Sequence, residues 1–165
     1  MKTIAVFNTE NVSGEEAKDF HARKAVRIVV FDNDKNIAVI HSHKPNFYTL
    51  PGGGTEKGES LQQAAIRECK EEIGCDVAIQ SEIGLITEYR KRENLIKESY
   101  CYLACIIEEK GESPLFDDGL RMSTVWVSIG EAIGLIKSSD KPTSYLAEFA
   151  AQRDVNFLEQ AKGSL

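Results

Sequence analysis

Long apolar segments are missing from this sequence, and so is any excess of positive charge. No run of apolar residues approaches the roughly 20 that a membrane-spanning helix needs, so we expect no membrane partner. Lysine and arginine together number 20 against 26 aspartate and glutamate residues, which gives a net charge of −6. An acidic chain offers no overall basic field to a polyanion, so we expect no nucleic-acid partner.

Cysteine and histidine are both scarce, which limits disulfide and zinc chemistry. The four cysteines are Cys69, Cys75, Cys101 and Cys105. They form no Cys-x-x-Cys pair, so we expect buried, reduced thiols. His41 and His43 can share one strand face, but no further ligand stands near them in the sequence, which disfavours a zinc site. The amino-terminal apolar stretch is too short for a signal peptide, and we therefore expect a cytoplasmic protein.

Internal repeats, linkers and low-complexity segments are also absent from the sequence. The chain has 165 residues, enough for one domain with a sizeable core, and its 42% hydrophobic and 28% charged residues are ordinary for a globular protein. We therefore expect a single domain over residues 1–165, with residues 1–22 and 138–165 as peripheral additions. These two additions are also candidate surfaces for a homodimer.

Extended and helical segments alternate irregularly along the chain. β-Branched and apolar residues predict strands at 2–7, 25–31, 37–40, 76–80, 83–89, 100–107 and 124–127. Helices are expected between Ser60 and Gly74, at 129–137, and at about 144–162. In the last helix we expect Leu146, Phe149, Ala150 and Leu158 to face the core. Strands with helices inserted between them predict an α+β fold with a mixed sheet.

The most informative segment runs from Leu50 to Cys75, where a glycine turn precedes a helix dense in carboxylates. Ser60 is a suitable N-cap and Gly74 a suitable end for this helix. At about 100° per residue, the three acids Glu68, Glu71 and Glu72 fall within about 100° of one another. Beside them lies an expected apolar arc of Ala65, Ile66, Cys69 and Ile73. The acids are therefore predicted at the edge of the buried face.

Three carboxylates at this spacing repel one another, and each raises the pKa of its neighbours. A divalent cation would relieve the repulsion. Oxygen ligands without histidine or cysteine favour Mg²⁺, or Mn²⁺, over Zn²⁺. The glycines at 52–54 allow a close approach of the backbone and can present peptide groups to a metal or a phosphate. On helix geometry alone, an exposed and solvated acidic helix is the alternative interpretation.

This segment resembles the Nudix box, G-x5-E-x7-R-E-U-x-E-E-x-G-U, in which U is a bulky aliphatic residue. The fixed positions that match are Gly53, Glu59, Arg67, Glu68, Glu71, Glu72 and Gly74. Cys69 and Cys75 depart from the pattern at the two U positions, where a buried cysteine acts as a small hydrophobic residue. The resemblance covers about residues 23–137. It implies the Nudix fold, an α/β/α sandwich with a mixed central sheet and the box helix.

The resemblance also implies an activity, the Mg²⁺-dependent hydrolysis of a diphosphate bond in a nucleoside diphosphate linked to another moiety. Substrates of this class include damaged nucleoside triphosphates, dinucleoside polyphosphates and ADP-ribose. The alternative is a Nudix-like domain that binds or senses a nucleotide without turnover. The complete set of box carboxylates favours the hydrolase, because a sensor has less need of them.

The resemblance assigns roles to the box residues. The implied metal ligands are Gly53, through its carbonyl, and the carboxylates of Glu68, Glu71 and Glu72. Arg67 completes the catalytic set, and by analogy it pairs with Glu59 or Glu71 and steadies the carboxylates. Glu59 and Gly74 are then structural residues.

Residues outside the box are candidates for a further acid and for substrate binding. The acid candidates are Asp117 and Asp118, before the strand that contains Trp126, and Glu98; Glu68 is also a candidate for the general base. Loops are rich in acids, so solvation is the alternative for each of these three outer acids. For the substrate, Arg27 is a candidate phosphate ligand and Tyr48 a candidate to stack on a base, with core packing as the alternative for Tyr48. A basic turn at 90–92 is either a phosphate contact or a solvated turn.

Overall fold

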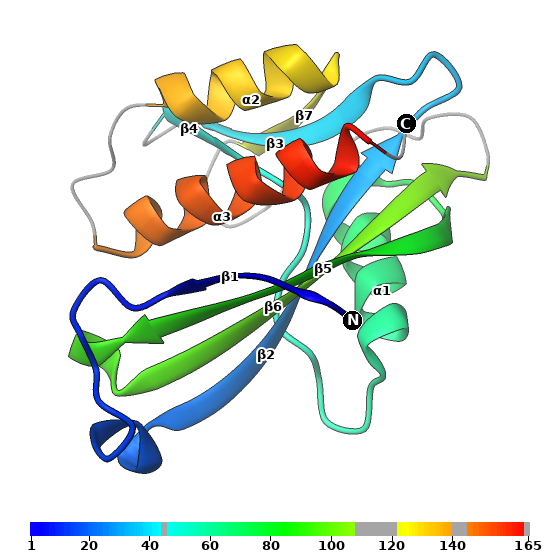
Figure 1. Cartoon of the computed structure of the whole chain (residues 1–165). Helices are drawn as coiled ribbons and strands as arrows, with labels where there is room; N and C mark the ends of the chain where they lie inside the picture. The colour runs from blue at the N-terminus through cyan, green and yellow to red at the C-terminus, as the bar shows by residue number, and fades with distance from the viewer. Residues whose placement is uncertain (44–45, 108–121, 140–144, 164–165) are drawn as a thin grey trace.

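The computed structural model describes residues 1–43, 46–107, 122–139 and 145–163, and within them seven strands form one mixed sheet (Figure 1). The strands are β1 (Thr3–Phe7), β2 (His21–Phe31), β3 (Ile37–His43), β4 (Asn46–Thr49), β5 (Val77–Arg90), β6 (Leu95–Ile106) and β7 (Met122–Val127). The helices are α1 (Leu61–Ile73), α2 (Ile129–Ser138) and α3 (Tyr145–Ala161), with two short 3₁₀ helices, η1 (Glu16–Asp19) and η2 (Lys91–Glu93). The expected α+β fold with a mixed sheet is confirmed.

The sheet opens beside β2, and the glycine turn occupies the opening. The strand order is β1-β5-β6-β2-β3-β4, with β7 also paired to β3. β2 pairs with β6 along its whole length but meets β3 at a single register pair, Phe31 with Ile37. Beyond that pair, the Val26 and Ile28 amides donate to the carbonyls of Gly53 and Pro51, at 2.9 and 3.0 Å. The turn is therefore held along the edge of β2.

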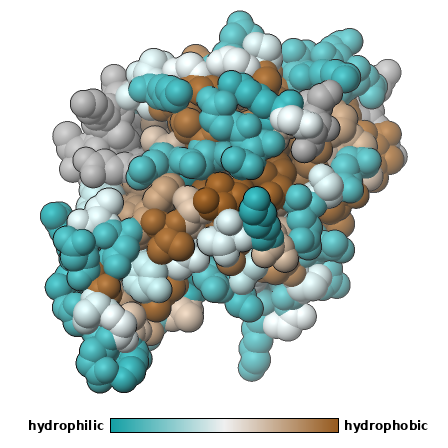
Figure 2. Space-filling model, viewed as in Figure 1, coloured by the Kyte–Doolittle hydropathy of each residue, from teal (hydrophilic) through white to brown (hydrophobic). Residues whose placement is uncertain are grey.

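Helices cover both faces of the sheet, which makes the α/β/α sandwich (Figure 1). On one face α1 packs Ala65 and Cys69 against alternate residues of β2, such as Ile28. On the other face α2 and α3 cover the remaining β2 residues, and Phe157 of α3 lies in that core. Figure 2 shows apolar residues between α3 and β1, and a hydrophilic tip where η1 lies. No helix in the described ranges is long and apolar enough to cross a membrane.

Two expectations for buried residues are wrong. Ile66 is 41% exposed, because the buried side of α1 is centred on Ala65 and Cys69 and turns toward the acids. Leu146 is 42% exposed, because it lies in the first turn of α3, and Tyr145 packs against the core there instead. The buried apolar residues of α3 are Phe149, Phe157, Leu158 and Ala161. This helix, within the segment 138–165, therefore contributes to the core.

Several strands extend beyond their expected bounds. β5 is one strand with register shifts at Ile79/Ser81 and Glu82/Gly84, and it replaces the two segments that we expected. A Cβ atom at Gly84 would lie 2.4 Å from the Ile4 side chain, which explains the need for glycine where β1 pairs with β5. β6 begins five residues earlier than expected, and the segment after Pro45 forms the short strand β4.

Candidate active site

Local sequence signals position the acidic helix at both ends. Ser60 accepts a hydrogen bond from the Gln63 amide at 3.2 Å, and the Gln63 side chain accepts one from the Ser60 amide at 2.9 Å. This reciprocal pair is a capping box, which satisfies two amides that the first helical turn leaves unpaired. At the other end Gly74 adopts a left-handed conformation, with φ of +69°, and ends the helix. Both ends were predicted.

Arg67 contacts three other fixed positions of the box, and the Gly54 carbonyl, through one guanidinium group. Its Nε and Nη2 donate to the two oxygens of Glu59, at 2.9 and 3.1 Å. Its Nη1 donates to Glu68 and to Glu71, both at 2.9 Å, and its Nη2 also donates to the Gly54 carbonyl at 3.0 Å. The hydrogen bonds to Glu59 come first among the causes that raise the pKa of Arg67. The arginine was expected to pair with Glu59 or Glu71, and it contacts both.

Gly53 places its backbone directly against the Glu68 carboxylate. A Cβ atom at position 53 would lie 2.3 Å from Oε1 and 2.9 Å from Oε2 of Glu68. Any other residue would therefore displace this carboxylate or the turn. The Gly53 carbonyl accepts a hydrogen bond from the Val26 amide, which leaves one of its lone pairs available.

The three helix carboxylates have different environments. Glu68 is buried, Glu72 is half-buried, and the Glu71 side chain is 56% exposed. Glu72 accepts a hydrogen bond from the Gly52 amide at 2.7 Å. Burial raises the pKa of Glu72 to about 7, against the opposing effect of this hydrogen bond. The carboxylate whose pKa burial raises is thus the one that the glycine turn holds.

The donor chemistry of the site fits a hard divalent cation, although the carboxylates are not gathered in advance. Among the residues that the structure describes, no three His, Cys, Asp or Glu side chains already form a metal-binding group. Arg67 occupies an oxygen of both Glu68 and Glu71, and the Gly52 amide holds Glu72. The available donors are all oxygens, and Glu68 lies against a glycine where no side chain obstructs it. A metal ion would compete with the hydrogen bonds that these carboxylates accept from Arg67 and from the Gly52 amide.

Comparison with known proteins settles the family. The family model described as NUDIX domain matches residues 21–148, which include the whole box and every strand from β2 to β7. The chain belongs to the Nudix family.

Relatives and solved structures agree with this assignment. A Bacillus subtilis protein, provisionally named an 8-oxo-dGTP diphosphatase, is 27% identical over 103 residues, which are 62% of this chain and 64% of that protein. The match thus spans less than two thirds of that relative. A NUDIX hydrolase from Nitrosomonas europaea shares the fold with a TM-score of 0.65 at 17% identity, over 87% of this chain and 90% of that one. A Caenorhabditis elegans Ap4A hydrolase has a TM-score of 0.62 at 19% identity, over 86% and 96%.

The structure places the candidates outside the Nudix box in several regions. Glu98, on β6, is half-buried and accepts a hydrogen bond from the Tyr100 hydroxyl at 2.9 Å. Tyr48 stacks on His41, with ring centroids 4.2 Å apart and planes 6° from parallel. Arg27 is half-buried and donates to the carbonyl of its neighbour Val26 at 2.7 Å. Asp117 and Asp118 lie outside the described residues.

The basic turn of this Nudix domain is not uniformly solvated. Lys91 and Arg92 are exposed, which agrees with a solvated turn. Arg90, in contrast, is buried and forms an ion pair with Glu88. Solvation is therefore wrong for Arg90. The reason is strand alternation, because Gly84, Ile86, Glu88 and Arg90 are the buried alternate residues of β5.

A group of buried charges on the α3 side of the sheet was missed from the sequence. It contains Glu88, Arg90, Arg153 and Asp154, with Lys97 beside them. The signal was present, since Lys97 and Ser99 continue the alternation of the buried Cys101 on β6. Arg153 likewise stands four residues from both Phe149 and Phe157, on the buried side of α3.

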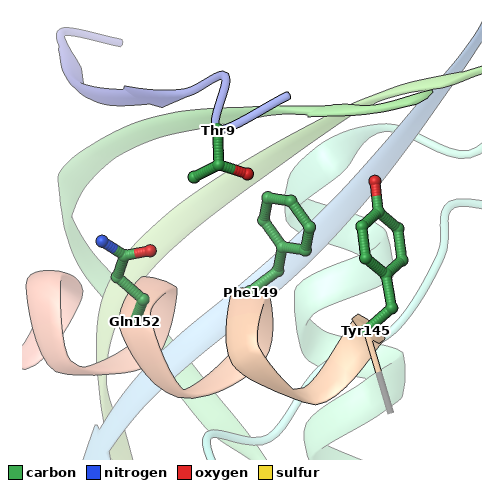
Figure 3. A pocket seen from close by; sticks show the side chains of 4 residues that line it. All are labelled: Thr9, Tyr145, Phe149 and Gln152. Carbon is green, nitrogen blue, oxygen red and sulfur yellow. The ribbon is translucent and has the colours of Figure 1, made fainter. Parts of the chain in front are cut away.

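A small pocket lies apart from the box. It has a volume of about 50 Å³ and is lined by Thr9, Tyr145, Phe149 and Gln152. Figure 3 shows that three of these side chains come from α3 and that Thr9 faces them from the loop after β1. The Arg90 guanidinium lies 5.5 Å from the centre of the Phe149 ring. No predicted site residue lines this pocket.

Proposed function

We propose that the chain is a Mg²⁺-dependent hydrolase that cleaves a diphosphate bond in a nucleoside diphosphate linked to another moiety. The observation that carries the proposal is the convergence of the box on Arg67, which directly contacts Glu59, Glu68 and Glu71. The names of the matched proteins, a diphosphatase and an Ap4A hydrolase, support the same bond type. The proposed partner is accordingly a nucleotide or nucleotide conjugate.

Four groups would hold the cation: the carboxylates of Glu68, Glu71 and Glu72, and the carbonyl of Gly53. A bound Mg²⁺, or Mn²⁺, supplies charge neutralisation for the diphosphate and makes a water more acidic. Arg67 orients Glu68 and Glu71 through its Nη1, while Glu59 fixes the guanidinium from the other side. The glycine turn at 52–54 would hold the phosphates beside β2, because Gly53 has no side chain to obstruct them.

For the general base we propose Glu68, because its buried carboxylate lies against the glycine turn. Asp118 is a second candidate from the sequence, and Glu98 is a third, with its carboxylate already bonded to Tyr100. Asp118→Asn tests the second candidate, because an unchanged rate would exclude Asp118 as the base. Loss of hydrolysis in Glu68→Gln is expected for a metal ligand as well as for a base.

A second candidate function is a nucleotide-binding or sensor domain without turnover. The specific observation in its favour is that Arg67 occupies Glu68 and Glu71, so the described residues hold no ready group of three metal ligands. A sensor would bind nucleotides with or without Mg²⁺ and release no product. The cytoplasmic location and a homodimer, both expected from the sequence, remain part of the proposal.

The test is release of phosphate and pyrophosphate across a panel of nucleotides in the presence of Mg²⁺. The panel contains nucleoside triphosphates, including oxidised ones, ADP-ribose, nucleotide sugars, dinucleoside polyphosphates, NADH and coenzyme A. We expect one class to be hydrolysed well above the others, and excess chelator to abolish the release. Binding by calorimetry without any release would contradict the hydrolase and support the sensor.

A further inference from the structure

The segment that leads into the glycine turn is held by one carboxylate from each of two helices. The Gly52 amide donates to Glu72 of α1 at 2.7 Å. Two residues earlier, the Leu50 amide donates to Asp154 of α3 at 3.0 Å. The segment lies in the opening of the sheet beside β2, and α1 and α3 cover opposite faces of that sheet (Figure 1). The two carboxylates therefore hold the same short segment from opposite sides.

Asp154 replaces a strand partner at the point where the chain leaves β4. Thr49 is the last residue of β4 and still pairs with β3, and the Pro51 carbonyl already accepts a hydrogen bond from β2. Between them Leu50 is buried, and its amide donates to Asp154. The Thr49 hydroxyl donates to the same carboxylate oxygen at 2.7 Å. Because a buried amide needs an acceptor, this carboxylate fixes the crossing from β3 to β2.

The Asp154 carboxylate is itself fixed and ionised. It is fully buried, and the Arg153 Nε donates to its second oxygen at 2.7 Å. Burial raises the pKa of Asp154, but the charge and the hydrogen bond of Arg153 outweigh this effect, so the pKa lies below its ordinary value. Hydrogen bonds to an ionised acceptor are stronger than those between neutral groups. The bonds from Thr49 and Leu50 are of this stronger kind.

The buried charges on the α3 side of the sheet form a series that ends at Asp154. Glu93 of η2 binds Arg90 at 3.2 Å, and Arg90 binds Glu88 at 2.8 Å. Glu88 lies 3.8 Å from Arg153, which in turn binds Asp154. Apolar residues can often replace buried ion pairs without loss of stability, so stability alone does not account for the series. Asp154 is the member that contacts the segment before the glycine turn.

A displacement of Leu50 would pass directly to the glycine turn. Pro51 stands between Leu50 and Gly52, and its ring fixes φ near −65°, which removes one of the rotations that could absorb the movement. Gly52 has no spare room, because a Cβ atom there would lie 2.3 Å from the Val26 carbonyl. The Gly52 amide, which holds Glu72, therefore depends on where Leu50 is anchored.

We propose that Asp154 is a positioning residue for the proposed hydrolysis. By holding the Leu50 amide and the Thr49 hydroxyl, it places the glycine turn against the glutamates of the Nudix box. The inference rests on the proposed function, because it gives α3 a part in the reaction of that site. Asp154 acts through the backbone of residues 49–52. A merely structural Asp154 would hold α3 on the sheet and leave the turn unaffected.

The first test is a pair of variants at Thr49, which leave the ion pair of Arg153 and Asp154 intact. Thr49→Val keeps the size of the side chain and removes the hydroxyl, and Thr49→Ser retains a hydroxyl. We expect Thr49→Val to lower kcat on the best substrate of the panel about three- to tenfold, as for the loss of one hydrogen bond. Thr49→Ser should keep the wild-type kcat.

The second test is Asp154→Asn, which removes the charge that both donors contact. We expect hydrolysis to fall about 10- to 100-fold, as for other residues that support metal ligands. Glu159→Gln is the matched control, because it changes an exposed carboxylate of the same helix that pairs with Lys162, and it should leave the rate unchanged. Circular dichroism verifies the fold, and if Asp154→Asn does not fold, the two Thr49 variants decide.

A readout without substrate accompanies the rates, namely amide hydrogen exchange measured by NMR in excess chelator. In Asp154→Asn and Thr49→Val, the Gly52 and Val26 amides should exchange faster by a larger factor than the amides of β5, which report global stability. Thr49→Ser and Glu159→Gln should exchange like the wild type. Loss of a merely structural contact would accelerate all of these amides by the same factor.

Either of two results would overturn the inference: an unchanged kcat in Thr49→Val, or exchange of the Gly52 and Val26 amides that follows global stability alone. Either result, with a lowered melting temperature, would indicate that Asp154 only holds α3 on the sheet. The exchange measurement also separates this inference from the proposed function. A wild type that hydrolyses nothing would refute the hydrolase, while selective exchange at Gly52 in the variants would still show that Asp154 positions the turn.

Discussion

Arg67 and Glu59, eight residues apart, are joined by two parallel hydrogen bonds of 2.9 and 3.1 Å. This bidentate pair ties the turn before α1 to the second turn of the helix. The same guanidinium group contacts Glu68, Glu71 and the Gly54 carbonyl. The pair therefore sets the position of the carboxylates relative to the glycine turn, on which the proposed hydrolysis depends.

Replacing Arg67 by lysine should impair this arrangement. A lysine keeps the charge but cannot make the bidentate contact, because its ammonium group lacks the planar fork. We expect hydrolysis to fall by about 10- to 100-fold, as for other residues that orient metal ligands. Lys18→Arg, at an exposed lysine of η1, is the control and should leave hydrolysis unchanged. Equal rates for Arg67→Lys and the wild type would contradict the orienting role.

Gly53→Ala tests the contact between the turn and the helix. The new Cβ atom would fall 2.3 Å from the Glu68 carboxylate, so either the carboxylate or the turn must move. We expect a lower melting temperature and a strong loss of hydrolysis. Gly130→Ala is the control, because a Cβ atom at Gly130 meets nothing within 4 Å on helix α2 and alanine favours a helix. A Gly53→Ala variant with full activity would refute the steric account.

Local signals made the box predictable, because its geometry depends on neighbours in the sequence. Ser60 and Gly74 bound the helix through capping and a left-handed turn, and the spacing of the acids put them on one side. The register between strands that are distant in the sequence could not be predicted in the same way. The pairing of Lys97 with both Arg23 and Glu88 depends on how β2, β5 and β6 associate. Single-sequence patterns do not specify that association.

The exposed Ile66 shows a related limit. Helical spacing placed it beside the acids, but spacing alone does not tell which side of the arc faces the sheet. The structure buries Glu68 in place of Ile66, because the glycine turn packs against the acidic side. The contact between Glu68 and the glycine turn thus replaces an apolar contact of Ile66, and hydrophobicity alone could not have predicted the burial of a carboxylate.

Ser60→Ala should destabilise the domain without touching the carboxylates. The variant loses the hydrogen bond from the Gln63 amide, and removal of such a cap costs about 1 kcal/mol. For a chain of this size that corresponds to a fall of about 2–4 °C in melting temperature. Ser60→Asp retains a capping oxygen and should keep the wild-type value. Urea unfolding of both variants measures the difference, and a stable Ser60→Ala would exclude the cap from the energetics.

Lys97 should make stability depend on pH. Its pKa is about 7 in the folded chain against an ordinary value of 10.5, so between these pH values the unfolded chain binds the additional proton. The free energy of unfolding should therefore rise with pH across this window. The charged groups that face Lys97 are Arg23 and Arg27 on β2, Glu88 and Arg90 on β5, and Arg153 on α3.

Lys97→Met removes this titration. The variant should be more stable than the wild type at pH 7, and the advantage should shrink as the pH approaches 10.5. Urea unfolding at intervals of one pH unit measures both proteins. A difference that stays constant from pH 7 to pH 10 would show that Lys97 does not titrate in this range.

The central claim is that the box carboxylates support a metal-dependent hydrolysis. Its most direct test is the rate of phosphate or pyrophosphate release from the best substrate of the panel, for the wild type and Glu72→Gln. Both are measured with Mg²⁺ and with excess chelator, and Glu15→Gln, at an exposed glutamate near η1, is the control. We predict release by the wild type and the control with Mg²⁺, loss in chelator, and a loss of orders of magnitude in a folded Glu72→Gln. Undiminished release in chelator, or near wild-type release by Glu72→Gln, would contradict the claim.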